Sequence, residues 1–447
     1  MNSVVLVLIS IFVLVFMIAK LKINAFISLL LVSLALALAL GNSGGQAVTL
    51  VMNGFGSTMG ACGVIIVFGV IIGYILEKTG GAEKIASSVL KVTGEDKAIL
   101  AMCMTGSLVS IPVFADSAFL ILFPIIKNLS RKGKISFMGI TLGTVVCLAL
   151  THSTIPPTPG PIAAASILGA DLGKVILYGI IISIPATLAV FLYASKVLAK
   201  KYPLPVLEEA EEEKGIDYSE LLKEEYKNSK GYSTFSAYLP IVIPIILIVI
   251  QSFSANIFPK EHILNKIFSL IGNPVIALLM GVAVVWVITK EYKTEVKLNW
   301  LEKAMDSTAM VILITCAGGA FGSVIKSSDI GTVITNLMGG LNLPNVMLPW
   351  LISAALITAT GSTTVALTTA AAVCTSILPA LNISPELCVA AIAAGGMCVL
   401  HVNSSMFWLV QRMCKFEVSD ILKSIVTLSF ICSFAALATT FILSYFI

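Results

Sequence analysis

The chain consists largely of apolar runs that are long enough to cross a membrane. A membrane-spanning helix needs about 20 mostly apolar residues to cross a hydrocarbon core of about 30 Å. Runs of this kind recur along nearly all of the 447 residues, and one long charged stretch, residues 199–234, interrupts them. Charged residues make up 12% of the chain, against roughly 25% in soluble domains. The sequence therefore predicts an all-α polytopic membrane protein without a soluble domain.

Basic residues predict the orientation of the chain in the membrane. Lysine and arginine cluster at residues 20–22, 78–97 and 127–134 and in the charged stretch 199–234. Cytoplasmic loops carry an excess of these residues, so we expect all four regions to face the cytoplasm. This orientation places the N- and C-termini outside, in a multi-pass protein of the cell's inner membrane.

The segment 98–126 has to enter and leave the membrane on the same side. It is apolar, yet basic cytoplasmic signals flank both of its ends. Its centre, "SIPVFADSAF" (110–119), contains Pro112 and Asp116, which suit a break and would be costly in a plain spanning helix. We therefore expect a re-entrant hairpin here.

The two halves of the chain resemble each other in the order of their motifs. Residues 54–90 align with residues 304–338, and further along His152 aligns with His401. Order and spacing persist although few residues are identical. Because the second hairpin, at about 348–380, has non-basic flanks, it should enter from outside. The repeat is then inverted, as in secondary transporters that bind solutes near the membrane midplane.

The predicted organisation is two inverted-topology repeats, each with a re-entrant hairpin and a broken transmembrane helix. The first repeat covers residues 1–198, with scaffold helices at 4–41, the hairpin at about 98–126 and the broken helix at about 135–168. Residues 199–234 form a cytoplasmic charged linker. The second repeat covers residues 235–447, with scaffold helices at 237–289, the hairpin at about 348–380 and the broken helix at about 384–412.

Polar and helix-breaking residues mark the two broken helices. Four prolines fall in "LTHSTIPPTPGPIA" (150–163), where each removes a backbone donor and clashes with the preceding turn. The second half has "HVNSSMFW" (401–408) at the corresponding place. Freed backbone groups can meet a solute, and helix N-termini favour a carboxylate. Since no cluster of lysine or arginine lies at this depth, the sequence favours a small monocarboxylate rich in hydroxyls over a phosphate or a dicarboxylate.

Six motifs carry a resemblance to a known family. "GFGSTMG", "FADSAF", "THSTIPPTPGPIAAA", "GADLG", "ATGSTTVA" and "HVNSSMFWLV" resemble, in this order, motifs of the gluconate:proton symporter (gluconate permease) family within the ion transporter superfamily. The resemblance implies proton-coupled transport of gluconate, related sugar acids, D-serine or other small hydroxy or amino acids. Ser404 stands where the family usually has aspartate, and Thr158 where sugar-acid members often have histidine. These departures favour a smaller or differently substituted acid than gluconate.

These patterns give a candidate site and its partners. We expect Asp116 and Ser117 to carry the coupling ion, because a carboxyl at membrane depth can load and release a proton in each cycle. The sequence predicts no cofactor, no metal and no nucleic-acid partner. The expected partners are an organic acid, a coupling cation, the lipid bilayer and, by the superfamily resemblance, a second copy of the chain. The expected substrate-binding residues are His152, Ser153, Thr154, Pro157, Gly160, Gly361, Ser362, Thr363, Thr364, His401, Asn403, Ser404 and Ser405.

Each of these residues also has a structural interpretation. Asp116 can cap the hairpin turn, His152 and His401 can brace the breaks, and Asn403 and the hydroxyls can bond to nearby backbone. The predicted function is a secondary active importer that works by alternating access and proton symport, and is not an enzyme. The alternatives are a sodium-coupled organic acid symporter and, from another class, a membrane-embedded subunit of an ion-pumping decarboxylase. An enzyme would need a catalytic motif, and the sequence contains no HExxH.

Overall fold

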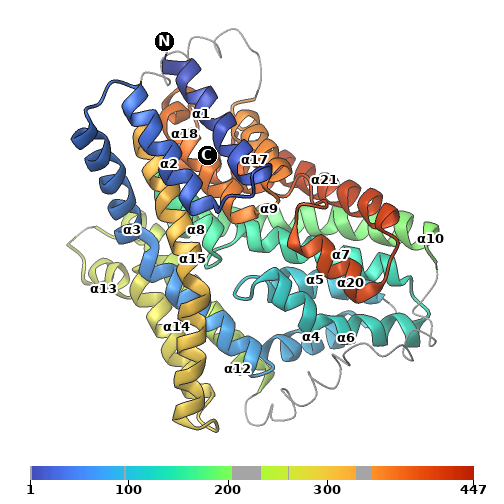
Figure 1. Cartoon of the computed structure of the whole chain (residues 1–447). Helices are drawn as coiled ribbons and strands as arrows, with labels where there is room; N and C mark the ends of the chain where they lie inside the picture. Colours follow the sequence, from blue (N-terminus) through green and yellow to red (C-terminus); the bar gives the residue numbers. More distant parts are fainter. Residues whose placement is uncertain (1–2, 95–96, 204–232, 260, 329–343) are drawn as a thin grey trace.

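The structure of the protein, a computed structural model, describes residues 3–94, 97–203, 233–259, 261–328 and 344–447, and every regular element in them is a helix (Figure 1). The helices of the first half are α1 (Ser3–Ala19), α2 (Ala25–Ala39), α3 (Gly44–Lys78), α4 (Gly81–Thr93), α5 (Ala98–Val109), α6 (Ala115–Gly133), α7 (Phe137–Thr154), α8 (Pro159–Leu168), α9 (Leu172–Tyr193), a π-helical turn (Ala194–Leu198) and α10 (Ala199–Lys201). Those of the second half are α12 (Thr234–Ile257), α13 (Ile263–Ile271), α14 (Pro274–Ile288), α15 (Thr294–Lys326), α17 (Met347–Thr360), α18 (Thr363–Leu381), α19 (Pro385–Gly395), α20 (Ser405–Cys414) and α21 (Val418–Leu443). Most of the predicted linker 199–234 lies outside the described residues.

Several helices have the length and composition that a membrane crossing requires. Within the described residues, seven helical segments are long and apolar enough to span a bilayer, and α7 and α8 together form one of them. Helices α13 and α14, which bend by 63° where they meet, form an eighth if the pair counts as one span. The prediction of an all-α polytopic membrane protein is confirmed.

Two pairs of helices have the same length in the two halves. Helices α6 and α18 both have 19 residues, and α8 and α20 both have 10. Helix α6 is followed by the left-handed residue Lys134, and α18 by the left-handed Asn382. Two residues later, Ser136 and Ser384 cap the next helix by accepting a backbone N–H three positions on. These two pairs of helices and their junctions thus correspond between the halves, whereas α7 has 18 residues and α19 has 11.

The long helices α3 and α15 pack closely along each other. A Cβ at Gly54 would lie 2.6 Å from the Cβ of Ser323, and a Cβ at Gly319 would overlap the side chain of Thr58. Glycine at such positions lets two backbones approach, as is common between helices in membranes. Because residue 54 meets residue 323 and residue 58 meets residue 319, the two helices run antiparallel.

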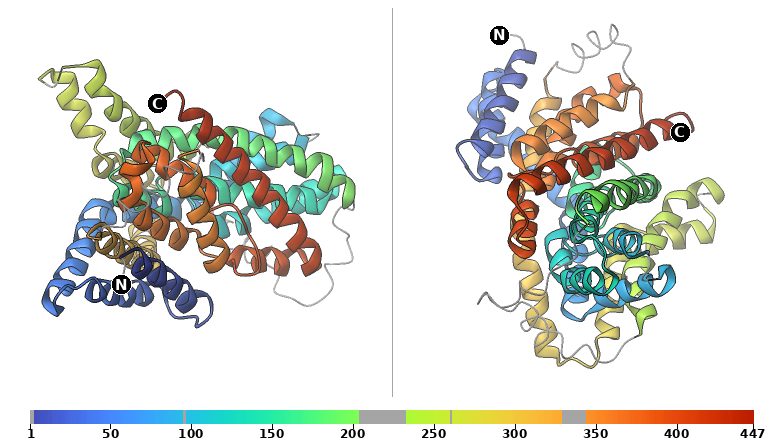
Figure 2. Two further views of the ribbon diagram at one scale, coloured as in Figure 1. Left: turned by 90° about the horizontal axis from the view of Figure 1, so that it is seen from above. Right: turned by 90° about the vertical axis from the view of Figure 1, so that its right-hand side faces the viewer.

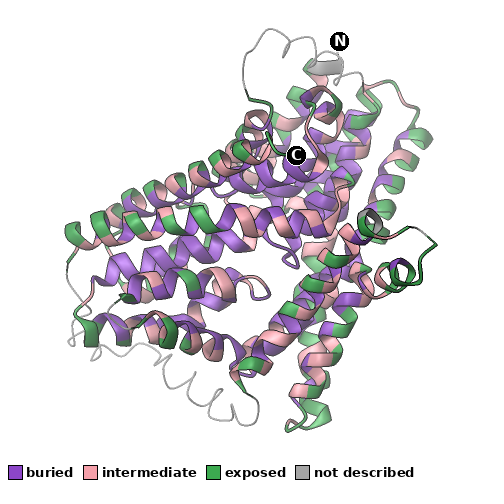
Figure 3. Ribbon diagram, turned by 180° about the vertical axis from the view of Figure 1, so that it is seen from behind, coloured by how far each residue is buried: buried purple, intermediate pink, exposed green. Residues whose placement is uncertain are grey.

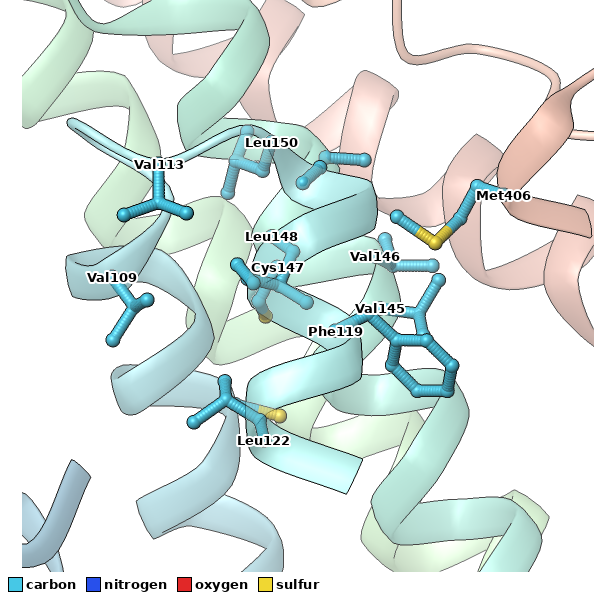
Figure 4. Packing of buried hydrophobic residues seen from close by; sticks show 14 of the residues in the cluster. Val109, Val113, Phe119, Leu122, Val145, Val146, Cys147, Leu148, Leu150 and Met406 are labelled. Atoms are coloured by element: carbon cyan, nitrogen blue, oxygen red, sulfur yellow. The ribbon is translucent and has the colours of Figure 1, made fainter. Parts of the chain in front are cut away.

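The broken helix α7–α8 lies in the middle of the protein. About nine-tenths of the most apolar part of this span is buried inside the protein (94%), and Figure 3 shows that buried residues are concentrated in the middle of the protein. Apolar side chains of α5 and α6, such as Val109 and Leu122, form one cluster with α7 side chains such as Val146, and Met406 of the second half belongs to it as well (Figure 4). Helices α1–α2 and α12–α13 lie on different sides of this centre (Figure 2). The first break is therefore held inside a packed core, whereas Val402 and Asn403 of the second break, and Ser405 directly after it, are exposed.

Candidate functional site

A cavity of about 340 Å³ lies where turns and breaks from both halves of the chain meet. The turns are those between α5 and α6 and between α17 and α18, and the breaks are those after α7 and before α20. The cavity is lined by Phe114, Ala115, Asp116, Ala149, His152, Thr360, Gly361, Ser362, Thr363, Thr364, Leu400, Asn403, Ser404, Ser405 and Met406.

The turn between α5 and α6 brings Asp116 to the cavity. The turn contains Pro112, which cannot continue a helix hydrogen-bond ladder. Helix α3 packs against it at Gly73, where a Cβ would overlap the carbonyl oxygen of Pro112. Helix α6 begins at Ala115, so Asp116 lies in its first turn and lines the cavity.

The first break is formed by proline. Helix α7 ends at Thr154, just before Pro156–Pro157, and α8 begins at Pro159, whose fixed φ suits the first position of a helix. Prolines have no N–H, so this break offers few backbone donors. His152 lies in the last turn of α7 and lines the cavity, with its ring 5.7 Å from that of Phe114.

The turn between α17 and α18 supplies hydroxyl groups. Gly361 follows α17 with a φ of 69°, the left-handed region that favours glycine. A Cβ there would also overlap the backbone of Asn403, so glycine lets the turn approach the second break. Helix α18 begins at Thr363 with Ser362 as its N-cap. One wall of the cavity therefore carries Thr360, Ser362, Thr363 and Thr364.

The second break, residues 396–404 between α19 and α20, is non-helical and contains a turn near each of its ends. Ser429 of α21 accepts a hydrogen bond from the backbone N–H of Leu400 at 3.1 Å and donates to the carbonyl oxygen of Cys398 at 3.2 Å. Unpaired backbone groups are costly inside a membrane, and this serine satisfies two of them. The break ends where α20 begins at Ser405.

Three helix N-termini meet at the cavity without side-chain caps. Helices α6, α18 and α20 begin at Ala115, Thr363 and Ser405, and the N-cap side chain of none of them bonds to its first turn. Free N–H groups and the helix dipole give such an end a partial positive charge, which attracts an anion. Among the described residues of the lining, Asp116 is the one acid, and lysine and arginine do not occur. The cavity suits a small anion with hydroxyl groups.

One hydrogen bond joins the two halves across the cavity. The hydroxyl of Ser405 donates to Oδ2 of Asp116 at 2.8 Å. Ser405 is the first residue of α20, so the carboxyl group of Asp116 lies at the N-terminal end of a helix from the other half. The acid of the first hairpin thus occupies a position that suits an anion.

Most residues singled out from the sequence come together here. The cavity collects candidates that lie far apart in the chain, from the first hairpin, the end of α7, the second hairpin and the second break. Their role in binding stays a prediction. These residues are Asp116, His152, Gly361, Ser362, Thr363, Thr364, Asn403, Ser404 and Ser405.

The remaining candidates of the first half lie outside the cavity lining. The hydroxyl of Ser153 donates to the carbonyl oxygen of Ala149 at 2.7 Å, and that of Thr154 to the carbonyl oxygen of Leu150 at 2.8 Å. Both hydroxyls therefore bond within their own helix. The other candidates outside the lining are Ser117, which is half-buried on α6, Pro157, which packs against Gly69, and Gly160, which faces Leu367.

His401 and Asn403 hold the second hairpin against the second break. Nε2 of His401 lies 2.8 Å from the carbonyl oxygen of Thr358, and Nδ1 accepts the backbone N–H of Asn403 at 3.3 Å. The amide of Asn403 donates to the carbonyl oxygens of Thr358 and Ala359, both at 3.4 Å. His401 lies outside the lining, whereas Asn403 lines the cavity and braces the hairpin as well.

The whole chain matches one protein family. The sequence model described as GntP family permease matches residues 2–446. The chain belongs to this family. The resemblance to gluconate permeases is therefore confirmed, and the protein is a multi-pass membrane permease.

Relatives of this permease carry several names. It is 35% identical to an uncharacterized permease of Haemophilus influenzae over an alignment of 435 residues. This alignment covers 94% of this chain and 87% of the relative. It is 30% identical to a gluconate permease of Pseudomonas aeruginosa, over 91% of this chain and 90% of the relative. It is also 30% identical to the D-serine transporter DsdX of Escherichia coli, over 98% of both chains. The family and these relatives are permeases and transporters, and two of the relatives are named for gluconate and D-serine.

A solved structure has the same fold as this permease. The YdaH transporter of Alcanivorax borkumensis superposes with a TM-score of 0.66, over 94% of this chain and 98% of that one, at 15% sequence identity. At this identity the likeness shows the fold alone.

Part of the lining of the permease's cavity consists of residues that the sequence motifs did not indicate as candidates. Phe114, Ala115 and Thr360 line the cavity, and all three belong to the motifs "FADSAF" and "ATGSTTVA" that contain residues singled out. Ala149 lies one helical turn before His152, so it shares that residue's face of α7. Leu400 and Met406 flank the polar residues of the second break. Proximity to the motifs could have indicated all of these residues, but the apolar side chains of Leu400 and Met406 carry no sign of a binding role.

Proposed function

We propose that the permease imports a small hydroxy-monocarboxylate, such as a sugar acid or a related hydroxy acid, by proton symport. The observation that carries this proposal is the meeting of three uncapped helix N-termini, a wall of hydroxyls and one carboxyl group in a single cavity. The helix ends would hold the substrate carboxylate, and the hydroxyl side chains would replace part of its water shell. With lysine and arginine missing from the described lining, a single negative charge suits the cavity better than two.

Asp116 is the proposed proton carrier, with Ser117 beside it. It is the carboxyl group of the cavity, and it lies next to the helix ends at which a carboxylate substrate would bind. An ionised Asp116 would repel an anionic substrate at this distance. Loading one proton onto Asp116 removes that repulsion, so proton and substrate would travel together.

Alternating access between two inverted repeats is the proposed transport mechanism. The corresponding helices α3 and α15 run antiparallel, which supports an inverted relation between the halves. We propose that α1–α2 and α12–α14 form a scaffold, that two copies of the chain pair in the inner membrane, and that both termini lie outside. The turns and breaks would move against this scaffold to expose the cavity to one side at a time.

A zwitterionic amino acid is the second candidate substrate. An ionised Asp116 could pair with an ammonium group while the helix ends hold the carboxylate. D-serine carries both an ammonium group and a carboxylate, and one of the relatives is a D-serine transporter. The two classes differ in pH dependence, because an ammonium group requires an ionised Asp116 and an anionic acid requires a protonated one.

Uptake by the purified protein in liposomes tests the proposal. We expect labelled gluconate, or a smaller hydroxy acid that competes with it, to accumulate under an inward proton gradient, and a proton uncoupler to abolish this accumulation. Counterflow driven by unlabelled solute should occur without any gradient, which distinguishes a carrier from a channel. Uptake that follows a sodium gradient and ignores the uncoupler would establish the sodium-coupled alternative. Absence of counterflow for every hydroxy acid and for D-serine would refute the organic acid carrier itself, and a decarboxylase subunit would then be the class to test.

A further inference from the structure

We propose that the carboxylate of Asp116 and the carboxylate of the substrate take turns at the hydroxyl of Ser405 and the N-terminus of α20. This inference rests on the proposed function and adds how proton and substrate are coupled. Asp116 already makes the contact that an anionic substrate would need, because Ser405 donates to its Oδ2 at 2.8 Å. The protein's own carboxylate thus keeps the anion position filled until it is protonated.

Because Ser405 is the first residue of α20, the proposed exchange of carboxylates takes place at the N-terminus of this helix. Helix α20 has no side-chain cap, so its first-turn N–H groups and the Ser405 hydroxyl are donors at the cavity wall. Asn403 and Ser404 line the same wall, directly before the helix. A substrate carboxylate placed here would share its donors with Asp116, and two carboxylates cannot both be ionised at one small group of donors without strong repulsion.

The proposed cycle conserves protons and charge. A proton from outside binds the carboxylate of Asp116, which becomes neutral and releases the Ser405 hydroxyl. The substrate carboxylate then accepts from Ser405 and from the first turn of α20. When the substrate leaves on the inside, Asp116 loses its proton there and accepts from Ser405 again. One proton and one monocarboxylate cross together, with no net charge moved.

Few other titratable groups can take over this role. Among the residues that the structure describes, His152 is the other titratable residue of the lining, and its ring lies against Phe114. Charged residues of the elements packed against α6 lie outside the lining, as do the basic residues near the far end of α6. These are Glu77 and Lys78 of α3, Glu83, Lys84 and Lys91 of α4, Arg412 of α20, and Lys127, Arg131 and Lys132 of α6.

A first experiment needs no knowledge of the substrate. Ser405→Cys is treated with an anionic and with a cationic methanethiosulfonate reagent of similar size, and the ratio of the two labelling rates cancels the effect of pH on the thiol itself. We expect the ratio of anionic to cationic labelling to fall by roughly an order of magnitude from about pH 5 to about pH 9 as Asp116 ionises. In the double variant Ser405→Cys, Asp116→Asn the ratio should stay constant. Eight of the nine native cysteines are buried and Cys414 is half-buried, so little background labelling is expected.

A cysteine at Asn345 provides the matched control. Asn345 is exposed and lies outside the cavity, so the ratio at this position should not follow the state of Asp116. A ratio at Ser405→Cys that does not change with pH, or that changes equally with and without Asp116, overturns the inference.

A second experiment measures proton uptake on binding. Calorimetry of the whole protein with gluconate, in buffers of different ionisation enthalpy, should give about one proton taken up per acid bound at neutral pH, and close to none for Asp116→Asn. The asparagine variant should bind with the same affinity at acid and alkaline pH. Ser405→Ala should bind more weakly and still take up the proton. If Asp116→Asn takes up a proton as the wild type does, the inference is wrong.

The two experiments separate this inference from the proposed function. A pH-dependent labelling ratio together with no binding of gluconate, glycerate or lactate would support the exchange at Ser405 and reject the proposed substrate class. Binding of a hydroxy acid with a labelling ratio that ignores Asp116 would support the substrate class and overturn the exchange.

Discussion

Gly73 of α3 lies directly against the carbonyl oxygen of Pro112, with no room for a Cβ between them. One helical turn earlier, on the same face of α3, a Cβ at Gly69 would lie 2.8 Å from the carbonyl oxygen of Pro157. A single helix face thus sets the position of the hairpin turn before Asp116 and of the break that follows α7.

Replacing Gly73 with alanine should therefore displace the first hairpin. Forcing a methyl group into this contact should cost about 1–3 kcal/mol, seen as a lower thermal midpoint of the purified protein. Uptake should fall further than stability, because Asp116 moves with the turn. Gly56→Ala is the control, since a Cβ at this α3 position meets no atom within 4 Å. Equal behaviour of the two variants would contradict the role of this contact.

Asp116→Asn should separate exchange from accumulation. The amide keeps the size of the side chain and removes the titratable proton, so we expect exchange between equal pools to persist and accumulation driven by a pH gradient to disappear. Both are measured on one preparation of proteoliposomes. If folding or both activities are lost together, Asp116 is a structural acid of the hairpin turn.

Asn403→Ala should weaken binding at the second break. The amide lines the cavity and donates to two carbonyl oxygens at the end of α17, so its loss removes a polar wall group and a brace of the hairpin. We expect the apparent dissociation constant of the substrate to rise severalfold, or uptake to stop, while expression stays near the wild-type level. Thermal shift titration and uptake together check this, and an unchanged affinity would leave Asn403 with a structural role alone.

Cysteine labelling should establish the topology of the two hairpins. A cysteine at Lys132, an exposed residue near the end of α6, should react with an impermeant reagent only from the cytoplasm. A cysteine at Asn345, just before α17, should react only from outside. Lys132 is preferable to its neighbour Ser130, which is fully buried. Reaction of both from the same face would refute the inverted repeat.

The sequence predicts those features of the fold that follow from local chemistry. Length and hydrophobicity predict the spans, and proline predicts the break between α7 and α8, because Pro156–Pro157 cannot continue the helix that ends at Thr154. The second break carries no proline within it. It was placed by comparing the halves and by its polar residues.

Side-chain direction is what the sequence could not supply. Ser153 and Thr154 follow His152 in the chain, yet their hydroxyls bond within α7 while His152 lines the cavity, since each residue of a helix points about 100° away from the last. The contact between Asp116 and Ser405 joins residues from different halves of the chain. Such a contact depends on how the halves pack, which no local pattern records.

The prolines of the first break have a consequence for stereochemistry. Pro157 and Pro159 occupy the positions, relative to the start of α8, that Asn403 and Ser405 occupy relative to the start of α20. Two identical breaks would offer an acid two equivalent poses with opposite ends exchanged. Since proline has no N–H to donate, the proposed acid substrate would meet more backbone donors at the second break than at the first. Its hydroxyl-bearing carbon then has a fixed surrounding, and the permease should distinguish the two enantiomers of its substrate.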